Sequence, residues 1–399
     1  MKFNTIEEII KDLKENKIVM IVDDDDSEDV GVLATIASGI TEPIINKMIE
    51  IAHDEILFAS LPKCFTRLHI PAAFERQIIT KEEEQVITID LLNDKSPRTK
   101  HLALLINHLI SPEAKKEDFV RPGNLTVIRS RIGGVLKRAG HPEAIVDLGK
   151  LSGLYPAGVF ARLIGKSGNP LDQIELEKIA EENNLKVISI SSIIAYRKLT
   201  ENLIVRAAEA NLPTSHGDFR MIGFENATNG EHHVALVKGN IGPNDEVLVR
   251  VHSECLTGDA FGSKKCDCGE QLNAALDKIE REGKGVLLYM RQEGRGIGLI
   301  NKIKAYALQD QGMDTVDANL ALGFDEDLRD YGIGAQILTD LGVRKVRLMT
   351  NNPLKLKGLA GHGIEIVSRE PIQLNHNERN LNYMMTKKER MGHLLKFKE

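Results

Sequence analysis

The sequence has few cysteines, four in 399 residues, and no long hydrophobic run. So few cysteines do not suit a small secreted domain that is held together by disulfides. No apolar stretch approaches the ~18 residues of a membrane-spanning helix. The first residues also lack the apolar core of a signal peptide. We therefore expect a cytoplasmic protein with no membrane partner.

Other absences limit the partners further. A net charge of −6 argues against a broad nucleic-acid-binding surface. The P-loop pattern of nucleotide-binding proteins is missing, and so is the glycine spacing of the dinucleotide-binding fingerprint. We find no internal repeat and no low-complexity tract. With 42% hydrophobic and 28% charged residues, the chain has the composition of a globular protein, and it is long enough for two domains.

The spacing of apolar residues predicts helices and strands in both halves of the chain. In the first half it predicts helices at 6–13 and 174–184 and strands at 18–22 and 186–190, and Arg121-Pro122-Gly123 predicts a loop. In the second half it predicts strands at 233–237, 246–250 and 285–290 and helices at 270–282 and 300–309. We expect an α/β (α+β) fold of two domains, at 1–199 and 200–399.

Three of the four cysteines, Cys255, Cys266 and Cys268, lie within fourteen residues. Three thiolates bind Zn²⁺ tightly and leave the fourth tetrahedral position for a water, as a catalytic zinc requires. His252 is close in sequence and could fill that position instead, which would make the site structural. A disulfide is disfavoured by the expected compartment. The remaining cysteine, Cys64, is most simply a buried or incidental thiol.

A glycine-rich segment follows the last predicted strand. Residues 291–298 read Arg-Gln-Glu-Gly-Arg-Gly-Ile-Gly and lead into a predicted helix. Glycines between a strand and a helix let the backbone approach a phosphate, and the start of the helix offers free N–H groups. Arg295 adds a charged fork that suits phosphate oxygens. By itself the segment could equally be a flexible turn.

The motifs around these two segments point to a known family. Arg-Val-His-Ser-Glu occupies 250–254, Asp-Glu-Asp-Leu-Arg-Asp-Tyr occupies 325–331, and Leu-Met-Thr-Asn-Asn-Pro-Leu-Lys occupies 348–355. From about residue 204 to 375 the chain resembles GTP cyclohydrolase II, a zinc enzyme that begins riboflavin synthesis. The resemblance implies a reaction in which GTP, with Mg²⁺, gives a diaminopyrimidine ribosyl phosphate, formate and pyrophosphate. We also expect a homodimer.

The resemblance implies a role for individual residues. It places zinc on the three clustered cysteines, makes Asp327 the general base and Arg329 a nucleophile toward the α-phosphate, and puts Tyr306 near the reacting centre. The implied GTP contacts are Arg250, Val251, His252, Ser253, Glu254, Gln271, Glu293, Gly294, Arg295, Thr315, Thr350 and Lys355. A protonated guanidinium is a poor nucleophile. Arg329 could instead clamp phosphate charge in the transition state.

Four stretches of the first half form a second set of motifs, at residues 18–26, 117–123, 133–141 and 156–159. Through them the chain resembles, from about residue 6 to 197, 3,4-dihydroxy-2-butanone 4-phosphate synthase, a family that is often fused ahead of GTP cyclohydrolase II. It implies that Glu28 and His141 correspond to the two Mg²⁺ ligands of that family.

Several positions depart from the synthase pattern. Where the family has Asp-Arg-Glu-Asn-Glu-Gly-Asp, residues 26–32 read Asp-Ser-Glu-Asp-Val-Gly-Val, which loses an arginine and two carboxylates. Arg162 stands where the catalytic glutamate is expected, and no counterpart of the sugar-phosphate loops is recognisable between Phe74 and Leu105. The synthase reaction needs carboxylates to move protons and a metal to hold the enediolate. We therefore expect an inactive synthase domain with a vestigial magnesium site, retained for dimerisation or control.

Other hypotheses remain open. Different residues could replace the lost ones in a bifunctional enzyme that also converts ribulose 5-phosphate. The chain could also be a zinc-dependent nucleotide sensor, which the presence of Asp327, Arg329 and Tyr306 disfavours. Family variants that remove only formate or only pyrophosphate differ by subtle changes in the pocket, and Tyr306 is the position to watch for them.

Overall fold

The chain folds into two compact units, Met1–Thr200 and Glu201–Glu399. The structure is a computed structural model that describes residues 1–23, 31–71, 86–165, 169, 171–324, 329, 331–360, 363–374, 377, 379–390 and 392–397. Within these ranges, no helix combines the length and the apolar character that crossing a membrane requires.

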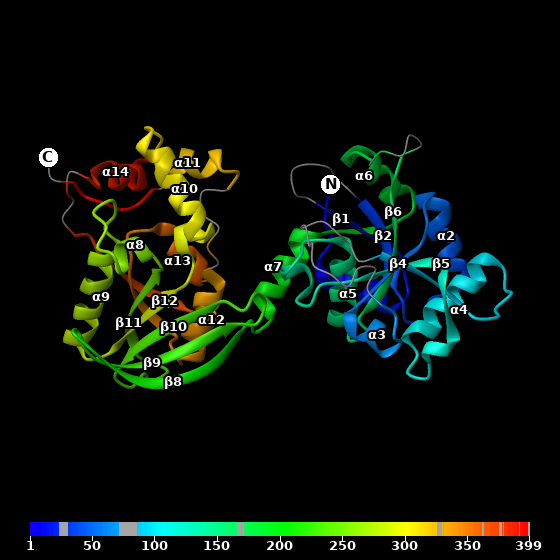
Figure 1. The fold of residues 1–399 in the computed structure, drawn as a ribbon, viewed down its shortest axis with the longest axis horizontal. Coiled ribbons are helices and arrows are strands. Elements are labelled where there is room, and N and C mark those ends of the chain that lie inside the picture. The colour runs from blue at the N-terminus through cyan, green and yellow to red at the C-terminus, as the bar shows by residue number, and fades with distance from the viewer. Residues whose placement is uncertain are drawn as a thin grey trace. The chain divides into compact units, whose positions relative to one another are not determined.

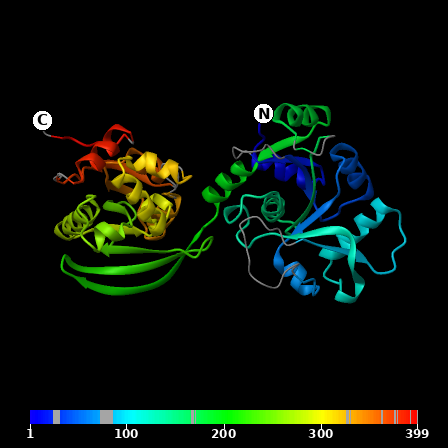
Figure 2. The same ribbon diagram turned by 45° about the horizontal axis from the view of Figure 1, so that its top comes forward.

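The amino-terminal unit is a mixed sheet with helices on both faces (Figures 1 and 2), and its described strands are ordered β4-β5-β3-β6-β2-β1-β7. The strands are β1 (Val19–Val22), β2 (Gly31–Ile36), β3 (Leu57–Ser60), β4 (Val86–Leu91), β5 (Phe119–Arg129), β6 (Ala157–Arg162) and β7 (Lys186–Ser189). The helices are α1 (Ile6–Lys14), α2 (Glu42–Ala52), α3 (Pro62–Arg67), α4 (Arg98–Ile110), α5 (His141–Leu151), α6 (Gln173–Glu182) and α7 (Ile190–Thr200), with short 3₁₀ turns η1 (Lys116–Asp118) and η2 (Gly134–Leu136).

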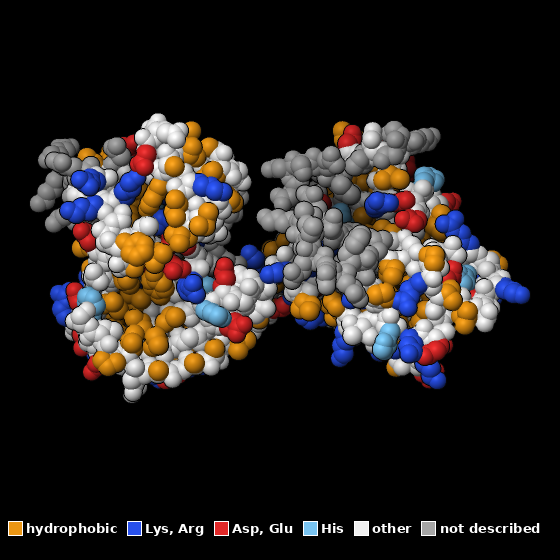
Figure 3. All heavy atoms as spheres, in the orientation of Figure 1, with side chains coloured by type: hydrophobic (Ala, Val, Ile, Leu, Met, Phe, Trp, Pro, Cys, Tyr) orange, Lys and Arg blue, Asp and Glu red, His pale blue; other side chains and the backbone are white. Residues whose placement is uncertain are grey.

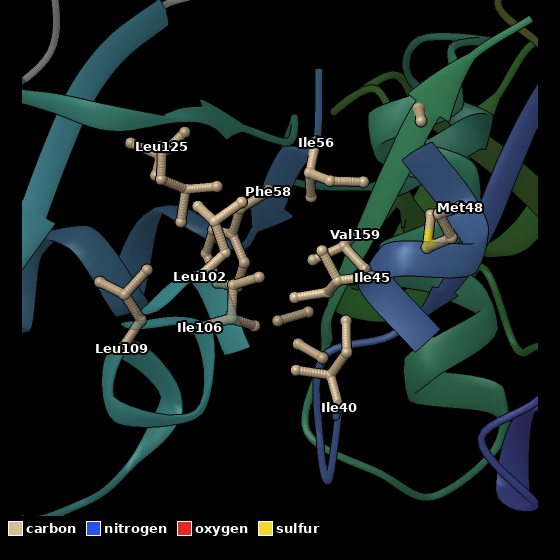
Figure 4. Close-up of a cluster of buried hydrophobic side chains, with 14 of the residues drawn as sticks. Ile40, Ile45, Met48, Ile56, Phe58, Leu102, Ile106, Leu109, Leu125 and Val159 are labelled. Atoms are coloured by element: carbon tan, nitrogen blue, oxygen red, sulfur yellow. The ribbon is translucent and has the colours of Figure 1, made fainter. Parts of the chain in front are cut away.

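The strands of this sheet are buried on both faces. Successive side chains point to opposite sides of a strand, so Met20 of β1 packs in one cluster with α2 and α4, and Ile21 packs in the other with α1 and α5. Figure 4 shows the first cluster, in which Ile45 of α2 and Leu102 of α4 lie near Phe58 of β3. Burial on both faces explains why the strands read as continuous apolar runs.

One segment that the sequence predicts as a loop is a strand. Arg121-Pro122-Gly123 lies inside β5, which pairs with β4 across a shift in register between Ile89 and Asp90. Gly123 is required at this irregularity, because a Cβ there would lie 2.0 Å from the backbone carbon of Ile89. The prediction of a loop was wrong because proline and glycine mark bulges within strands as well as turns.

The carboxy-terminal unit is also built on a mixed sheet, whose described strands are ordered β14-β13-β11-β12-β10-β9-β8. The strands are β8 (Ile204–Thr214), β9 (Gly217–Asn226), β10 (His232–Lys238), β11 (Glu246–Ser253), β12 (Gly285–Met290), β13 (Lys345–Met349) and β14 (Glu365–Glu370). The helices are α8 (Leu256–Asp259), α9 (Cys268–Glu282), α10 (Leu299–Asp310), α11 (Thr315–Ala321), α12 (Tyr331–Asp340), α13 (Pro353–Ala360) and α14 (Leu381–Glu389), with a 3₁₀ turn η3 (Glu293–Gly296). The α+β class and the segments predicted in this half are confirmed.

Helices cover the middle of this sheet from both sides. Leu276 of α9 packs against Leu248 and Leu287, whereas Gly334 of α12 lies over Leu288 on the other face. Strands β14, β13, β11 and β12 are parallel, so their carboxyl ends meet at one edge, where α/β proteins bind their ligands. The antiparallel β8–β9 ribbon forms the far side of the sheet (Figures 1 and 2).

Candidate active site

A pocket lies at the carboxyl ends of the parallel strands of the carboxy-terminal unit. Ser253 is the last residue of β11, Glu293 follows β12, and Thr350 follows β13, and all three line the pocket. Of the implied GTP contacts and catalytic residues, those that line it are Arg250, His252, Ser253, Glu254, Gln271, Glu293, Gly294, Arg295, Tyr306, Thr315, Arg329, Thr350 and Lys355. The side chain of Val251 does not line the pocket, although its carbonyl oxygen accepts a hydrogen bond from Lys355 Nζ at 2.9 Å.

The three clustered cysteines are brought together at one end of this pocket. Cys255 follows β11, and Cys266 and Cys268 lie at the start of α9, with all three sulfur atoms within 4.8 Å of one another. Cys255 Sγ and Cys266 Sγ are 3.7 Å apart, and all are free thiols. Two thiolates on a tetrahedral zinc at about 2.3 Å would lie about 3.8 Å apart. The spacing and the donor set therefore fit a zinc ion.

The short helix α8 packs closely against the thiols. A Cβ at Gly258 would lie 2.8 Å from Cys266 Sγ and 3.1 Å from Cys255 Sγ, so only glycine fits there. In the part of the chain that the structure describes, no histidine or carboxylate joins the three thiols. Hydrogen bonds with the Cys266 and Cys268 thiols, together with the Lys302 ammonium, lower the pKa of Cys255, as a metal ligand requires.

His252 holds the loop instead of completing the cluster. Its Nε2 lies 3.1 Å from both carboxylate oxygens of Asp259, and its ring stacks on Tyr289 with centroids 5.5 Å apart. Asp259 also accepts hydrogen bonds from the backbone N–H of Cys255 at 2.9 Å and from the Tyr289 hydroxyl at 2.8 Å. Burial lowers the pKa of His252, so its imidazole is neutral near pH 7. Its Nδ1 is buried and has no hydrogen-bond partner among the described residues.

Lys302 connects the cysteines to the glycine-rich segment. Its Nζ lies 3.1 Å from Cys255 Sγ and donates hydrogen bonds to Glu293 Oε1 at 2.7 Å and Thr257 Oγ1 at 3.0 Å. Burial alone would lower the pKa of Lys302, but the hydrogen bond to Glu293 and the charge of Cys255 raise it. No motif in the sequence indicated a role for Lys302. Only its position on α10, one helical turn before Tyr306, could have indicated that the two side chains lie together.

The glycine-rich segment has a left-handed backbone. Gly294 and Arg295 have φ values of 62° and 63° within η3, and Gly298, which caps α10, has a φ of 82°. A non-glycine residue in this conformation costs about 1 to 3 kcal/mol, and such strain is concentrated at functional sites. Glu293 holds the segment in place, because its Oε2 accepts a hydrogen bond from the backbone N–H of Leu256 at 2.7 Å.

A chain of buried hydrogen bonds fixes Arg250 on the floor of the pocket. Arg250 donates to Gln271 Oε1 at 2.6 Å and to the carbonyl oxygen of Met349 at 2.8 Å, and Gln271 donates to Asp267 Oδ2 at 2.6 Å. Burial lowers the pKa of Arg250 to about 10, which leaves it charged at neutral pH. The Nε atom of Arg250 is buried and has no partner among the described residues.

Two of the three implied catalytic residues, Tyr306 and Arg329, lie among the described residues and line the pocket. The Tyr306 hydroxyl lies 3.2 Å from Thr257 Oγ1, and burial raises the pKa of Tyr306. Arg329 donates a hydrogen bond to Ser253 Oγ at 3.4 Å. Asp327 lies outside the described residues.

In the amino-terminal unit, the departures from the synthase pattern are visible at β6. Arg162 ends this strand, faces Val32 of β2 in register, and forms an ion pair with Asp54 at 2.9 Å. Val32 is buried, and His141 begins α5. Glu28 lies outside the described residues, as do positions 27 and 30. Cys64 is buried in the core of this unit.

The pocket has one further wall that the sequence analysis did not predict. Tyr383 and Lys387 of α14 line it, and so do His393 and Leu395. Only the spacing of four residues between Tyr383 and Lys387 could have indicated a shared helix face.

Comparison with known proteins assigns both units. The family pattern described as 3,4-dihydroxy-2-butanone 4-phosphate synthase matches residues 7–196, and the pattern described as GTP cyclohydrolase II matches residues 205–371. The chain is 47% identical to riboflavin biosynthesis protein RibBA of Bacillus cereus strain ATCC 14579 and to that of Bacillus mycoides strain KBAB4, in each case over 98% of this chain and 99% of the relative. A crystal structure of RibBX, a two-domain 3,4-dihydroxy-2-butanone 4-phosphate synthase from A. baumannii, matches with a TM-score of 0.67 and 26% identity over 93% of this chain and 100% of that one.

Proposed function

Because the chain belongs to the family of fused 3,4-dihydroxy-2-butanone 4-phosphate synthases and GTP cyclohydrolases II, and is an enzyme of the latter kind, we propose that its carboxy-terminal unit converts GTP with a zinc ion on Cys255, Cys266 and Cys268. The products are 2,5-diamino-6-hydroxy-4-(5-phosphoribosylamino)pyrimidine, formate and pyrophosphate. Mg²⁺ accompanies the triphosphate of GTP.

The observation that carries this proposal is the three-thiol cluster at the end of a pocket lined by arginine and lysine. Zinc bound to three protein ligands keeps one position for a water and lowers the pKa of that water. Two buried nitrogens at the same pocket, Arg250 Nε and His252 Nδ1, lack partners among the described residues. Buried polar atoms are nearly always hydrogen-bonded in proteins, which supports a polar ligand at this place.

The positively charged residues of the pocket would bind the phosphates of GTP. Arg295, Arg329 and Lys355 bring positive charge to the phosphates, and guanidinium groups suit phosphate oxygens. Arg329 lines the pocket and donates one N–H hydrogen bond to Ser253, which also lines it. This geometry supports a phosphate clamp at Arg329 over a nucleophile, and we assign the general base to Asp327.

Replacement of one cysteine tests the zinc proposal. Cys268→Ser should lose both bound zinc and formate release from GTP, because serine is a poor zinc ligand. Cys64→Ser, which changes a buried thiol of the amino-terminal unit, is the matched control and should keep both. Full activity in zinc-free Cys268→Ser would refute the proposal.

We also propose that the amino-terminal unit lacks synthase activity. The ion pair between Arg162 and Asp54 puts a cation where the synthase family has its catalytic glutamate, and the buried Val32 replaces a carboxylate. Removing single charged groups from an active site commonly costs orders of magnitude in rate. The vestigial magnesium site at Glu28 and His141 remains part of this proposal.

A bifunctional enzyme is the second candidate. It is favoured by the match of the synthase pattern over residues 7–196 and by the A. baumannii structure, which is itself described as a two-domain synthase. Release of formate from ribulose 5-phosphate by the purified protein decides between the two.

The expected homodimer is likewise a proposal. In the face shown in Figure 3, hydrophobic side chains gather in a band between α8 and the β8–β9 ribbon of the carboxy-terminal unit. Val205 of the edge strand β8 is 53% exposed. Apolar patches of this kind are typical of protein interfaces. Light scattering on the purified chain would give twice the monomer mass if the proposal holds.

A further inference from the structure

The last described residues of the chain line the same pocket as the implied GTP contacts. Tyr383 and Lys387 come from α14, and His393 comes from the segment that follows it. Figures 1 and 2 show α14, in red, beside α11. All these residues lie beyond 205–371, the range that matches GTP cyclohydrolase II.

Lys387 is joined to the floor of the pocket by a buried ion pair. Its Nζ lies 2.8 Å from Asp267 Oδ1, and the two side chains are 12% and 2% exposed. The other oxygen of Asp267 accepts the hydrogen bond from Gln271, which in turn holds Arg250. The charge of Lys387 therefore helps to fix the orientation of Arg250, an implied GTP contact, through Asp267 and Gln271.

The segment after α14 is tied to the rest of the pocket by its backbone. The N–H of Leu394 donates to the carbonyl oxygen of Asn351 at 2.9 Å, next to the pocket residue Thr350. The N–H of Lys396 donates to Gln373 Oε1 at 2.8 Å. These bonds hold His393 at the pocket wall.

The charges around His393 favour an anionic ligand. Burial, followed by the charges of Lys387, Arg329, Lys355 and Arg295, lowers the pKa of His393 to about 3. The imidazole is therefore neutral at pH 7 and lies among four cations. A ring N–H in such a place donates well to a phosphate oxygen, and a triphosphate balances the surrounding positive charge.

We propose that α14 and residues 392–397 form a wall of the GTP pocket, where Lys387 positions Arg250 through Asp267 and Gln271, and His393 binds the phosphates of the substrate. This inference rests on the proposed GTP cyclohydrolase II function. It adds two substrate-pocket residues outside the matched family range.

The experiment compares five variants of the full, zinc-loaded protein. Lys387→Met removes the charge, and Lys387→Arg keeps it. Lys304→Met changes an exposed lysine of α10, outside the proposed wall, and is the control. For His393→Ala the control is His232→Ala, an exposed histidine of β10. Bound zinc, kcat and KM for GTP, and inhibition by inorganic tripolyphosphate are measured for each protein.

Lys387→Met should lower kcat/KM for GTP about tenfold to a hundredfold, as expected for loss of a buried charged hydrogen bond, and Lys387→Arg should recover most of it. His393→Ala should raise both KM and the inhibition constant of tripolyphosphate about tenfold, with kcat nearly unchanged. Both variants should keep their zinc.

Two results would overturn the inference while the unchanged protein still releases formate from GTP. One is that Lys387→Met and His393→Ala behave like their controls. The other is that Lys387→Met loses zinc, since the lysine would then hold the Cys266-Asp267-Cys268 segment and not the substrate contact. Absence of formate from the unchanged protein would overturn the proposed function as well.

Discussion

Lys302 offers the sharpest test of how this chain holds its metal. Its Nζ contacts Cys255 Sγ at 3.1 Å and Glu293 Oε1 at 2.7 Å, and the Lys302 and Glu293 side chains are 11% and 8% exposed. A zinc ion with three thiolates carries a net negative charge, which the ammonium offsets. At an effective dielectric constant near 20, a unit charge pair at this sulfur distance is worth about 5 kcal/mol as an upper bound.

Glu293 shares the same ammonium, so the net contribution of Lys302 to metal binding is smaller than this bound. A hydrogen bond to a charged group is worth about 1.5 to 3 kcal/mol, and loss of a residue that supports a metal ligand weakens metal binding about tenfold to a hundredfold. Lys302→Met should therefore weaken zinc binding by about that factor.

The assay is competition for zinc against a chromophoric chelator, with Lys304→Met as the control. Lys304 is exposed on the same helix, so its replacement should leave the affinity for zinc unchanged. Equal zinc affinity in Lys302→Met and the unchanged protein would refute the reasoning.

Three further predictions follow from the structure. Gly258→Ala should lower zinc content, because its Cβ would lie 2.8 Å from Cys266 Sγ; full zinc content by metal analysis would contradict this. Arg329→Ala should reduce GTP turnover about a hundredfold or more. Because we propose that Arg329 acts as a phosphate clamp, enzyme quenched during turnover should carry no guanylyl adduct on this residue, and mass spectrometry would detect such an adduct. Burial alone would lower the pKa of His101, but the carboxylates of Asp90 and Asp94 raise it. The ion pair therefore stabilises the folded protein fully below the unfolded pKa of about 6.5, and this stabilisation is lost as the pH rises through the folded pKa. His101→Gln should thus destabilise the protein more at pH 6 than at pH 9 in urea unfolding, and an equal effect at both pH values would count against the ion pair.

Much of the fold follows from local pattern. The apolar run at 285–290 coincides with β12, and the helical spacing at 270–282 lies within α9. The prediction of a loop at Gly123 was wrong, because the need for glycine there comes from a shift in register against β4. That partner strand is distant in sequence. Strand pairing of this kind is not visible in a single segment.

Some residues of the candidate site could be predicted from local motifs, whereas others could not. The cysteines and the glycine-rich segment carry motifs that are close in sequence, and the pocket contains both. Lys387 and His393 carry no motif, and their place in the pocket depends on contacts with Asp267 and Asn351, more than forty residues away in the chain. Only the folded structure brings these residues together.

We propose that this fused protein hydrolyses GTP at a zinc site and lacks synthase activity in its amino-terminal unit. The most direct test measures formate from the purified protein with Zn²⁺ and Mg²⁺, given GTP or ribulose 5-phosphate in parallel, because both family reactions release formate. We expect formate from GTP alone. Formate from ribulose 5-phosphate at a comparable rate would contradict the loss of synthase activity, and no formate from GTP would contradict the proposed zinc site.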